Sequence, residues 1–201
     1  MGIGKVGGPV IFLDRDGVLN PLVLNPANGR MESPLTVGEF RLAEGVLPAL
    51  LQLQTAGYSL ILVSNQPNYA LGKCSLEALH TIHAGLVREL DAAAIHFRRF
   101  CYCPHHPCGV VPGYAGVCAC RKPSPQFLLE ARDDFRLKLA ECWMIGDQLT
   151  DMECGRAAGV RTIHIRDEET RHASRDVDPG ADFFAKNLAE AVTVVLAHPP
   201  L

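Results

Sequence analysis

Short apolar runs recur along the chain, and each ends where polar residues or turn formers begin. A run of this length, rich in β-branched and aromatic residues, predicts a strand that is buried on both faces. Five such strands are predicted, at residues 9–14, 58–66, 96–103, 142–147 and 160–165.

Segments with helical spacing of their apolar residues lie between and after these runs. They predict helices over 45–57, 75–94, 124–135, 149–159 and 188–198. Ser75 and Ser124 are expected to be N-caps, the latter with Pro125 at the first helical position. Strands that alternate with helices predict a parallel sheet covered on both faces. We therefore expect a Rossmann-like three-layer α/β sandwich.

The length of 201 residues suits one domain with one sizeable core, so residues 1–201 are predicted to form a single domain. Residues 20–44, rich in Pro, Asn and Gly, are interpreted as an excursion from the sheet. Only short insertions separate the predicted elements, and no large cap domain is expected.

Composition narrows the class of protein. Hydrophobic residues make up 48% and charged residues 20%, which is typical of a globular chain. The formal net charge of −3 argues against a nucleic-acid partner. No apolar run is long enough to span a membrane, and the amino terminus lacks the layout of a signal peptide. A cytoplasmic protein with no membrane or nucleic-acid partner is expected.

Polar side chains follow several predicted strands. In open parallel sheets, binding sites form beyond the carboxyl ends of the strands. The residues placed there are Asp14 and Asp16 after the first strand, Ser64 and Asn65 at the end of the second, and Asp147 after the fourth, with Arg121 and Lys122 just before a helix.

These residue types fit phosphoryl transfer. Two carboxylates, Asp14 and Asp147, at neighbouring strand ends would need a cation, and Mg²⁺ prefers such oxygen ligands. Ser64 and Lys122 would hold the phosphoryl oxygens. Asp14 could attack phosphorus, while Asp16 protonates the leaving oxygen and then activates water.

A simpler interpretation is that Asp14 and Asp16 only cap a turn, as Asp often does. For the D-x-D pattern alone this would be preferred. The same chain, however, carries SNQ, RKP and GDxxxD in order along its alternating strands, and this context favours catalysis. Gly17 would allow the sharp turn that brings both carboxylates to one place.

Five of the eight cysteines lie between residues 101 and 120, which indicates a metal site. Cys103 and His105 form C-x-H, and Cys118 and Cys120 form C-x-C. Three thiolates and one imidazole suit a closed tetrahedral Zn²⁺ site of structural type. On spacing alone, Cys108 rivals His105. Zinc would then fix the conformation of the loop 101–121 and so position the basic pair Arg121 and Lys122.

The stretches FLDRDGVLN, VSNQ, CRKPSP and IGDQLTD resemble the four motifs of the haloacid dehalogenase (HAD) superfamily of phosphatases. CYCPHHP, CAC and RKP are similar to its heptose 1,7-bisphosphate 7-phosphatase branch, which neighbours the histidinol-phosphate phosphatases. The resemblance implies an aspartyl-phosphate on Asp14 and general acid/base catalysis by Asp16. Mg²⁺ would be held by Asp14, Asp147 and the backbone carbonyl of Asp16.

The resemblance also implies that Ser64 and Lys122 bind the phosphate and that Asn65 and Arg121 lie close to the substrate. Asp151 would either support the site, cap the following helix or contact the metal. The resemblance selects four zinc ligands: Cys103, His105, Cys118 and Cys120.

The expected substrate is a small phosphorylated sugar, with removal of the 7-phosphate of a heptose bisphosphate, by a monomeric enzyme. The alternatives are a histidinol-phosphate phosphatase and, in another class, a non-catalytic zinc-bearing binding protein. The loop after the second strand reads PNYALGK, which departs from the heptose enzymes. Arg30, Tyr69 and Lys73 are candidates for recognising the sugar.

Overall fold

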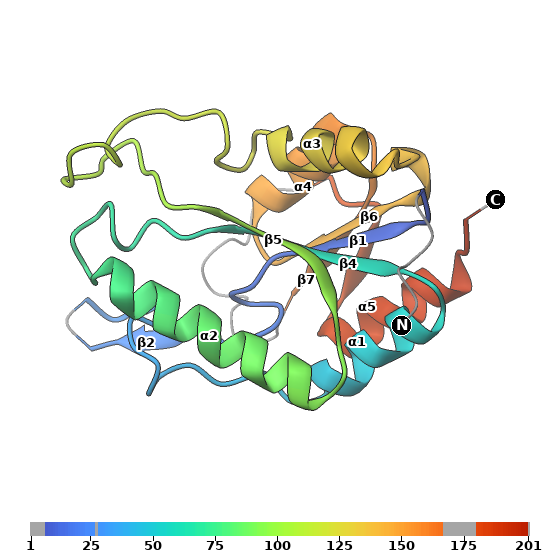
Figure 1. Cartoon of the computed structure of the whole chain (residues 1–201), viewed down its shortest axis with the longest axis horizontal. Helices are drawn as coiled ribbons and strands as arrows, with labels where there is room; N and C mark the ends of the chain where they lie inside the picture. Colours follow the sequence, from blue (N-terminus) through green and yellow to red (C-terminus); the bar gives the residue numbers. More distant parts are fainter. Residues whose placement is uncertain (1–6, 27, 167–179, 201) are drawn as a thin grey trace.

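A six-stranded, fully parallel sheet in the order β5-β4-β1-β6-β7-β8 forms the centre of the computed structural model, which describes residues 7–26, 28–166 and 180–200 (Figure 1). The strands are β1 (Val10–Leu13), β4 (Ser59–Asn65), β5 (Phe97–Cys103), β6 (Trp143–Gly146), β7 (Arg161–Ile165) and β8 (Phe183–Ala185). The five predicted strands are confirmed, and β8 is an additional edge strand.

The helices are α1 (Val46–Thr55), α2 (Leu76–Ala92), α3 (Gln126–Phe135), α4 (Leu149–Ala158) and α5 (Leu188–Ala197), with a short 3₁₀ turn at Leu139–Glu141. They cover both faces of the sheet (Figure 1). Helices α1, α2 and α5 share one core with Ile11 and Leu13. Helices α3 and α4 share the other with Val10 and Phe12. The predicted three-layer α/β sandwich is therefore confirmed.

β1 is continuously apolar because both faces of this strand are buried. Successive residues of a strand point to opposite faces, and both faces of this strand are covered by helices. All four of its residues are fully buried. β1 pairs with β4 on one side and β6 on the other, so the carboxyl ends of these three strands lie side by side.

The excursion at residues 20–44 contains a two-stranded antiparallel hairpin, β2 (Val23–Asn25) and β3 (Arg30–Glu32), separate from the main sheet.

Two expected helix starts have different outcomes. Ser75 caps α2, and its hydroxyl accepts a hydrogen bond from the Ala78 backbone N–H at 3.1 Å. The Ser124 prediction is wrong: α3 begins at Gln126 after Pro125, because Ser124 belongs to the preceding turn and donates its N–H to Arg121 O.

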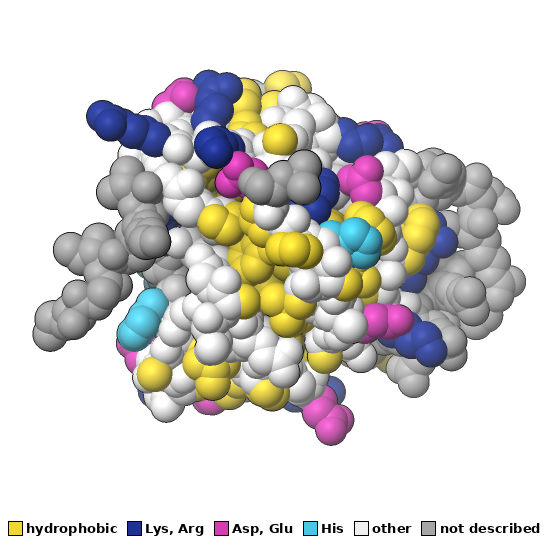
Figure 2. All heavy atoms as spheres, turned by 90° about the vertical axis from the view of Figure 1, so that its right-hand side faces the viewer, with side chains coloured by type: hydrophobic (Ala, Val, Ile, Leu, Met, Phe, Trp, Pro, Cys, Tyr) yellow, Lys and Arg dark blue, Asp and Glu magenta, His cyan; other side chains and the backbone are white. Residues whose placement is uncertain are grey.

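Hydrophobic side chains gather on the face of the molecule that lies away from the carboxyl ends of the strands (Figure 2). A shallow hollow of about 480 Å³ between α1 and α5 is lined by Pro48, Leu51, Gln52, Thr55, Ala56 and Leu196. Within the described part of the chain, no helix combines the length and apolar character that crossing a membrane requires.

Candidate active site

Three adjacent strand ends bring the predicted polar residues together. Asp14 follows β1, Ser64 is near the end of β4 and Asp147 follows β6. Lys122 reaches the same place from the loop that precedes α3. The side chains of Asp14, Ser64 and Lys122 are almost completely buried. Parallel topology thus collects these groups at one edge of the sheet, as the sequence predicts.

Lys122 lies at the centre of the cluster. Its Nζ donates to the Val63 carbonyl at 2.8 Å and forms ion pairs with Asp14 at 3.1 Å and Asp151 at 2.6 Å. Burial lowers the pKa of this ammonium, but the two carboxylates outweigh burial, and the pKa of Lys122 is raised. The buried lysine therefore stays charged.

The carboxylates outnumber this single cation. Burial raises the pKa of Asp14 to about 6; the Lys122 ammonium opposes this rise, and the nearby Asp151 and Asp16 add to it. Burial, together with Asp14, also raises the pKa of Asp147 well above its usual range. Asp147 Oδ1 is buried and has no hydrogen-bond partner among the described residues. The site therefore carries excess negative charge and one unused oxygen ligand.

The close approach of these carboxylates depends on two glycines. Gly17 has φ +78°, and a Cβ added there would overlap the Asp147 side chain. A Cβ added at Gly146 would overlap the Asp151 carboxylate in the same way. The turn that Gly17 was predicted to permit is present, and the glycine also makes space for a neighbouring acid.

The Asp16 carboxylate accepts hydrogen bonds from the side chains of Arg15, Asn20 and Gln66. Arg15 donates from Nε and Nη2 at 3.0–3.1 Å, and Asn20 and Gln66 donate at 2.9 and 2.6 Å. Burial alone would raise the pKa of Asp16, but the Arg15 charge and these hydrogen bonds hold it below its usual value. Asp16 is therefore a carboxylate in this structure.

Sequence reasoning missed the roles of Arg15 and Gln66. Gln66 also donates to the Ser64 hydroxyl at 3.0 Å and accepts from Arg15 at 2.8 Å, so it joins the ends of β1 and β4. The signal was present in the motifs DRDG and SNQ, but nothing in their spacing indicates that an arginine and a glutamine between catalytic-type residues are buried.

Asn65 and Arg121 both support the site in this structure. The Asn65 amide accepts from the Lys122 backbone N–H at 3.0 Å and donates to the Lys122 carbonyl at 3.1 Å. Arg121 donates to the backbone carbonyl of His105 at 3.2 Å. Contact of either side chain with a substrate stays a prediction.

Asp151 combines two of the functions expected for it. One carboxylate oxygen pairs with Lys122, and the other accepts from the Gln148 backbone N–H at 3.0 Å at the start of α4. The side chain therefore caps the helix and supports the buried lysine at the same time.

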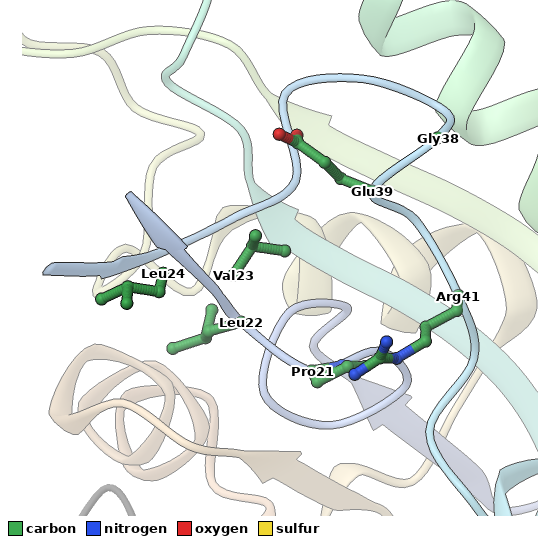
Figure 3. Close-up of a pocket in the computed structure, with 7 residues that line it drawn as sticks. All are labelled: Pro21, Leu22, Val23, Leu24, Gly38, Glu39 and Arg41. Carbon is green, nitrogen blue, oxygen red and sulfur yellow. The ribbon is translucent and has the colours of Figure 1, made fainter. Parts of the chain in front are cut away.

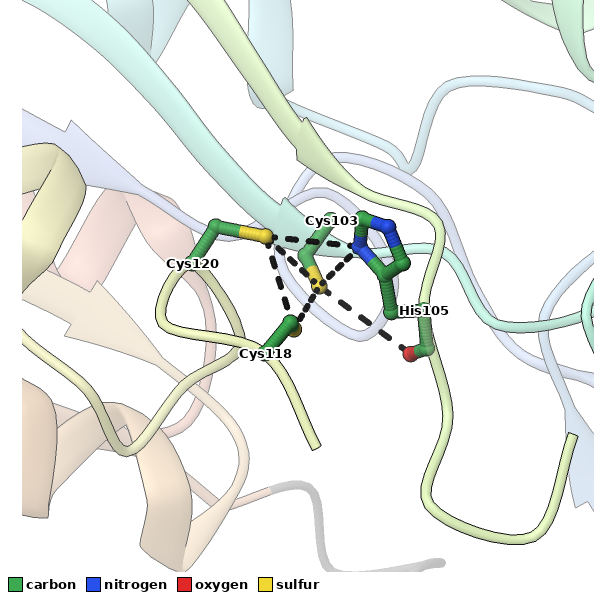
Figure 4. Close-up of side chains that lie close together, drawn as sticks. All are labelled: Cys103, His105, Cys118 and Cys120. Carbon is green, nitrogen blue, oxygen red and sulfur yellow. Dashed lines mark hydrogen bonds between the residues drawn. The ribbon is translucent and has the colours of Figure 1, made fainter. Parts of the chain in front are cut away.

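The four residues selected for zinc form a second cluster, at the end of β5 (Figure 4). The Sγ–Sγ distances among its three cysteines are 3.3, 3.5 and 3.5 Å. His105 Nδ1 lies 3.5 Å from Cys120 Sγ and 3.9 Å from Cys103 Sγ. In a tetrahedron with Zn–S bonds of about 2.3 Å, the sulfurs are about 3.8 Å apart, so the cluster has the size of a zinc site.

The alternatives left open by spacing lie outside this cluster. Cys108 is exposed, and its backbone N–H donates to His106 Nδ1 at 3.1 Å. Cys101 is a buried core thiol. The ring of Tyr114 stacks on His105 and contacts Tyr69 edge-on, so the cysteine loop packs against the loop that follows β4.

The β2–β3 hairpin borders the site. The Asn20 amide that binds Asp16 also donates to Pro21 O at 3.0 Å, where the hairpin begins. Lys73 pairs with Glu32 of β3 at 2.7 Å, which connects the hairpin to the loop after β4. A cavity of about 290 Å³ lies beside β2 and is lined by Pro21, Leu22, Val23, Leu24, Gly38, Glu39 and Arg41 (Figure 3).

Comparison with known proteins agrees with this geometry. The family model described as HAD-hydrolase-like matches residues 119–191. The D-glycero-beta-D-manno-heptose-1,7-bisphosphate 7-phosphatase of Escherichia coli K12 is 33% identical, over 90% of this chain and 91% of its own. The protein of the same name from Salmonella typhi is 32% identical over 93% of this chain and 95% of its own.

Solved structures give the same class. The chain is similar to the D,D-heptose 1,7-bisphosphate phosphatase of B. bronchiseptica, solved with magnesium and phosphate. The TM-score is 0.77 and the identity 25%, over 94% of this chain and 99% of the other. Fold and site together define a phosphatase of HAD type, a phosphoric monoester hydrolase. The chain belongs to the family of the D-glycero-beta-D-manno-heptose-1,7-bisphosphate 7-phosphatases.

Proposed function

We propose that this phosphatase removes the 7-phosphate of D-glycero-D-manno-heptose 1,7-bisphosphate in a Mg²⁺-dependent reaction. The observation that carries the proposal is the group of carboxylates Asp14, Asp147 and Asp151, whose oxygens lie within 4.8 Å of one another beside the buried Lys122, in a chain whose relatives bear the name of this reaction.

Mg²⁺ fits the residues present. Asp14 and Asp147 offer hard oxygen ligands, and Asp147 Oδ1 has no hydrogen-bond partner in the part of the chain that the structure describes. The excess negative charge also favours a divalent cation. The Asp16 carbonyl would complete the protein ligands. The bound cation would lower the negative charge on the phosphoryl oxygens and orient the phosphate toward Asp14.

The residues then act in two steps. An Asp14 carboxylate oxygen attacks phosphorus, the bond from phosphorus to the sugar oxygen breaks, and protonated Asp16 gives its proton to that oxygen. The charge of the bound phosphate raises the pKa of Asp16 and so favours this protonated form. In the second step water attacks the aspartyl phosphate, Asp16 takes the proton of water, and phosphate leaves with Asp14 regenerated.

Lys122 and Ser64 prepare the nucleophile. Lys122 forms an ion pair with Asp14 at 3.1 Å and keeps its attacking carboxylate in place, and the Ser64 hydroxyl helps to lower the pKa of Asp14. In the proposed reaction both groups would donate to the phosphoryl oxygens, where preorganised donors stabilise the transition state most.

The cysteine cluster is proposed to hold structural Zn²⁺ through Cys103, His105, Cys118 and Cys120. All four ligand positions of a tetrahedron would be filled, which leaves none for a substrate. Only Arg121 separates the cluster from Lys122 in the chain. The metal would therefore fix the loop that delivers the lysine. A monomer in the cytoplasm, formed by one domain over 1–201, stays the prediction for the whole chain.

The test is phosphate release from heptose 1,7-bisphosphate and from histidinol phosphate, with Mg²⁺ and with chelator, and ³¹P spectra to identify the phosphate removed. Asp14→Asn should abolish turnover, whereas Asp133→Asn, on the exposed face of α3, should leave it unchanged. A kcat/KM higher for histidinol phosphate than for heptose 1,7-bisphosphate would identify histidinol phosphate as the substrate instead. Absence of Mg²⁺-dependent release from a broad panel of phosphate esters would favour a binding protein.

A further inference from the structure

Asp147, the proposed magnesium ligand after β6, lies where the pairing of β6 with β7 ends. The last paired residues of the two strands are Gly146 and His164. Beyond this pair the His164 side chain continues the connection, because its Nε2 lies 2.9 Å from the backbone carbonyl oxygen of Asp147. His164 is 8% exposed, and hydrogen bonds are stronger in such a buried setting. A side chain outside the four recognised motifs therefore contacts the backbone of a metal-site residue.

A second contact gives this hydrogen bond its direction. Arg166 Nε lies 3.0 Å from Nδ1 of the His164 ring. A guanidinium has no acceptor, so Nδ1 must accept and carries no hydrogen. The hydrogen of the neutral imidazole is then on Nε2, which donates to the Asp147 carbonyl. Arg166 thus selects the tautomer of His164 that can bind Asp147.

Strand β8 holds Arg166 in place. The guanidinium carbon of Arg166 lies 4.0 Å from the centroid of the Phe184 ring, which is a cation–π contact. The Arg166 backbone N–H donates to Ala185 O at 2.9 Å. His164 and Phe184 are register partners in β7 and β8, and their rings meet edge-on. The edge strand that the sequence did not predict therefore supports the carboxyl end of β6 through two side chains.

The peptide bond between Asp147 and Gln148 is held at both of its polar groups. His164 binds its carbonyl, and the Asp151 carboxylate accepts from its N–H at 3.0 Å. Because a peptide unit is planar, these two hydrogen bonds fix the backbone that follows the Asp147 Cα. The rotamers open to a side chain depend on that backbone, so the direction of the Asp147 carboxylate depends on it as well.

We propose that His164 is a positioning residue of the magnesium site, which holds Asp147 by donating from Nε2 to its backbone carbonyl. The inference rests on the proposed function, in which Asp147 is a ligand of Mg²⁺. Removal of groups that orient metal ligands in this way typically costs about 10-fold to 100-fold in metal affinity or activity. Loss of the His164 donor should therefore weaken Mg²⁺ binding, whereas Asp14 and Asp16 stay in place for the reaction itself.

Three variants separate positioning from stability. His164→Leu removes the donor and keeps an apolar side chain that a buried position accepts. His164→Gln is the conservative variant, because its amide nitrogen can donate from nearly the place of Nε2. Thr162→Val is the matched control. Thr162 is fully buried two residues earlier on the same strand, and its hydroxyl donates to Asp182 at 2.9 Å. Valine removes that bond and should lower the Tm without moving Asp147.

Mg²⁺ binding is measured without substrate, from the rise in Tm with Mg²⁺ concentration. We expect the apparent Kd to increase about 10-fold to 100-fold in His164→Leu and to stay within about threefold of the wild type in His164→Gln and Thr162→Val. The Mg²⁺ concentration for half-maximal phosphate release should change in parallel, with kcat at saturating Mg²⁺ nearly unchanged.

The tautomer is measured in the wild type, by ¹⁵N NMR of the histidine rings at a pH where they are neutral. The signals of His164 are those that His164→Gln lacks. We expect its hydrogen on Nε2. This measurement tests the inference even if His164→Leu does not fold.

Three results would overturn the inference: wild-type Mg²⁺ affinity in His164→Leu, an equal loss of affinity in Thr162→Val, or a hydrogen on Nδ1 of His164. A failure of the proposed function appears in the wild type itself, as no rise in Tm with Mg²⁺ and no Mg²⁺-dependent release of phosphate, and the inference fails with it. A wild type that binds Mg²⁺, beside an unchanged His164→Leu, overturns the inference alone.

Discussion

Gly17→Ala tests whether the shape of the active site depends on a missing side chain. Gly17 has a left-handed φ of +78°, and its N–H donates to Asn20 O at 2.8 Å in the turn after β1. An added methyl group would overlap the Asp147 carboxylate. Gly159, at the end of α4, has the same φ of +78°, and no atom of the described residues lies within 4 Å of a Cβ added there.

The two glycines allow strain and overlap to be separated. A left-handed alanine costs roughly 1–2 kcal/mol, and this cost applies to both variants. At position 17 the Asp147 carboxylate must also retreat by about 1 Å to restore van der Waals contact, and a displacement of this size costs about 100-fold in rate. We expect kcat/KM to fall about 100-fold for Gly17→Ala and to stay within about twofold for Gly159→Ala.

The assay combines Mg²⁺-dependent phosphate release with urea unfolding of the same preparations. Gly17→Ala should lose more free energy of unfolding than Gly159→Ala, because the overlap with Asp147 adds to the shared backbone strain. Only Gly17→Ala should also lose activity and need more Mg²⁺ for half-maximal rate. The reasoning is refuted if Gly17→Ala keeps kcat/KM within threefold of Gly159→Ala, since the Asp147 position would then be irrelevant to turnover.

Three further outcomes are expected. Cys118→Ser should lower bound zinc, measured by atomic absorption, and lower the Tm, whereas Cys108→Ser should change neither; equal zinc in the two variants would exclude the predicted ligand set. Lys122→Met should cost about 3–5 kcal/mol of unfolding free energy in urea, because two buried carboxylates lose their cation, and wild-type stability would contradict the ion-pair argument. Asn65→Ala removes both hydrogen bonds to the Lys122 backbone and should lower kcat about 10-fold to 100-fold in the phosphate-release assay; unchanged kcat would show that these bonds do not position the lysine.

The sheet could be predicted because strands buried on both faces appear as continuous apolar runs. The β2–β3 hairpin could not, because each of its strands has three residues and its large apolar side chains, Leu24 and Met31, are exposed. Strand β8 is equally short, and within the described residues it pairs with β7 alone, at the sheet edge. Elements of this length contain too few residues for a period to be recognised.

The candidate site divides in a similar way. The gathering of Asp14, Ser64 and Asp147 follows from topology, since strand ends of a parallel sheet are adjacent. The burial of Arg15 and Gln66 does not follow, because charged and amide side chains are usually exposed and only their three-dimensional partners make burial tolerable.

The two glycines that give space to carboxylates also restrict how this enzyme can evolve. A residue larger than glycine at position 17 or 146 would displace the carboxylate of Asp147 or Asp151. Single substitutions at these two positions should therefore be selected against. The β2–β3 hairpin has no such restriction, because it lies outside the sheet and outside both cores. Laboratory selection for new phosphate esters should therefore accumulate substitutions in residues 21–34 and leave the glycines untouched.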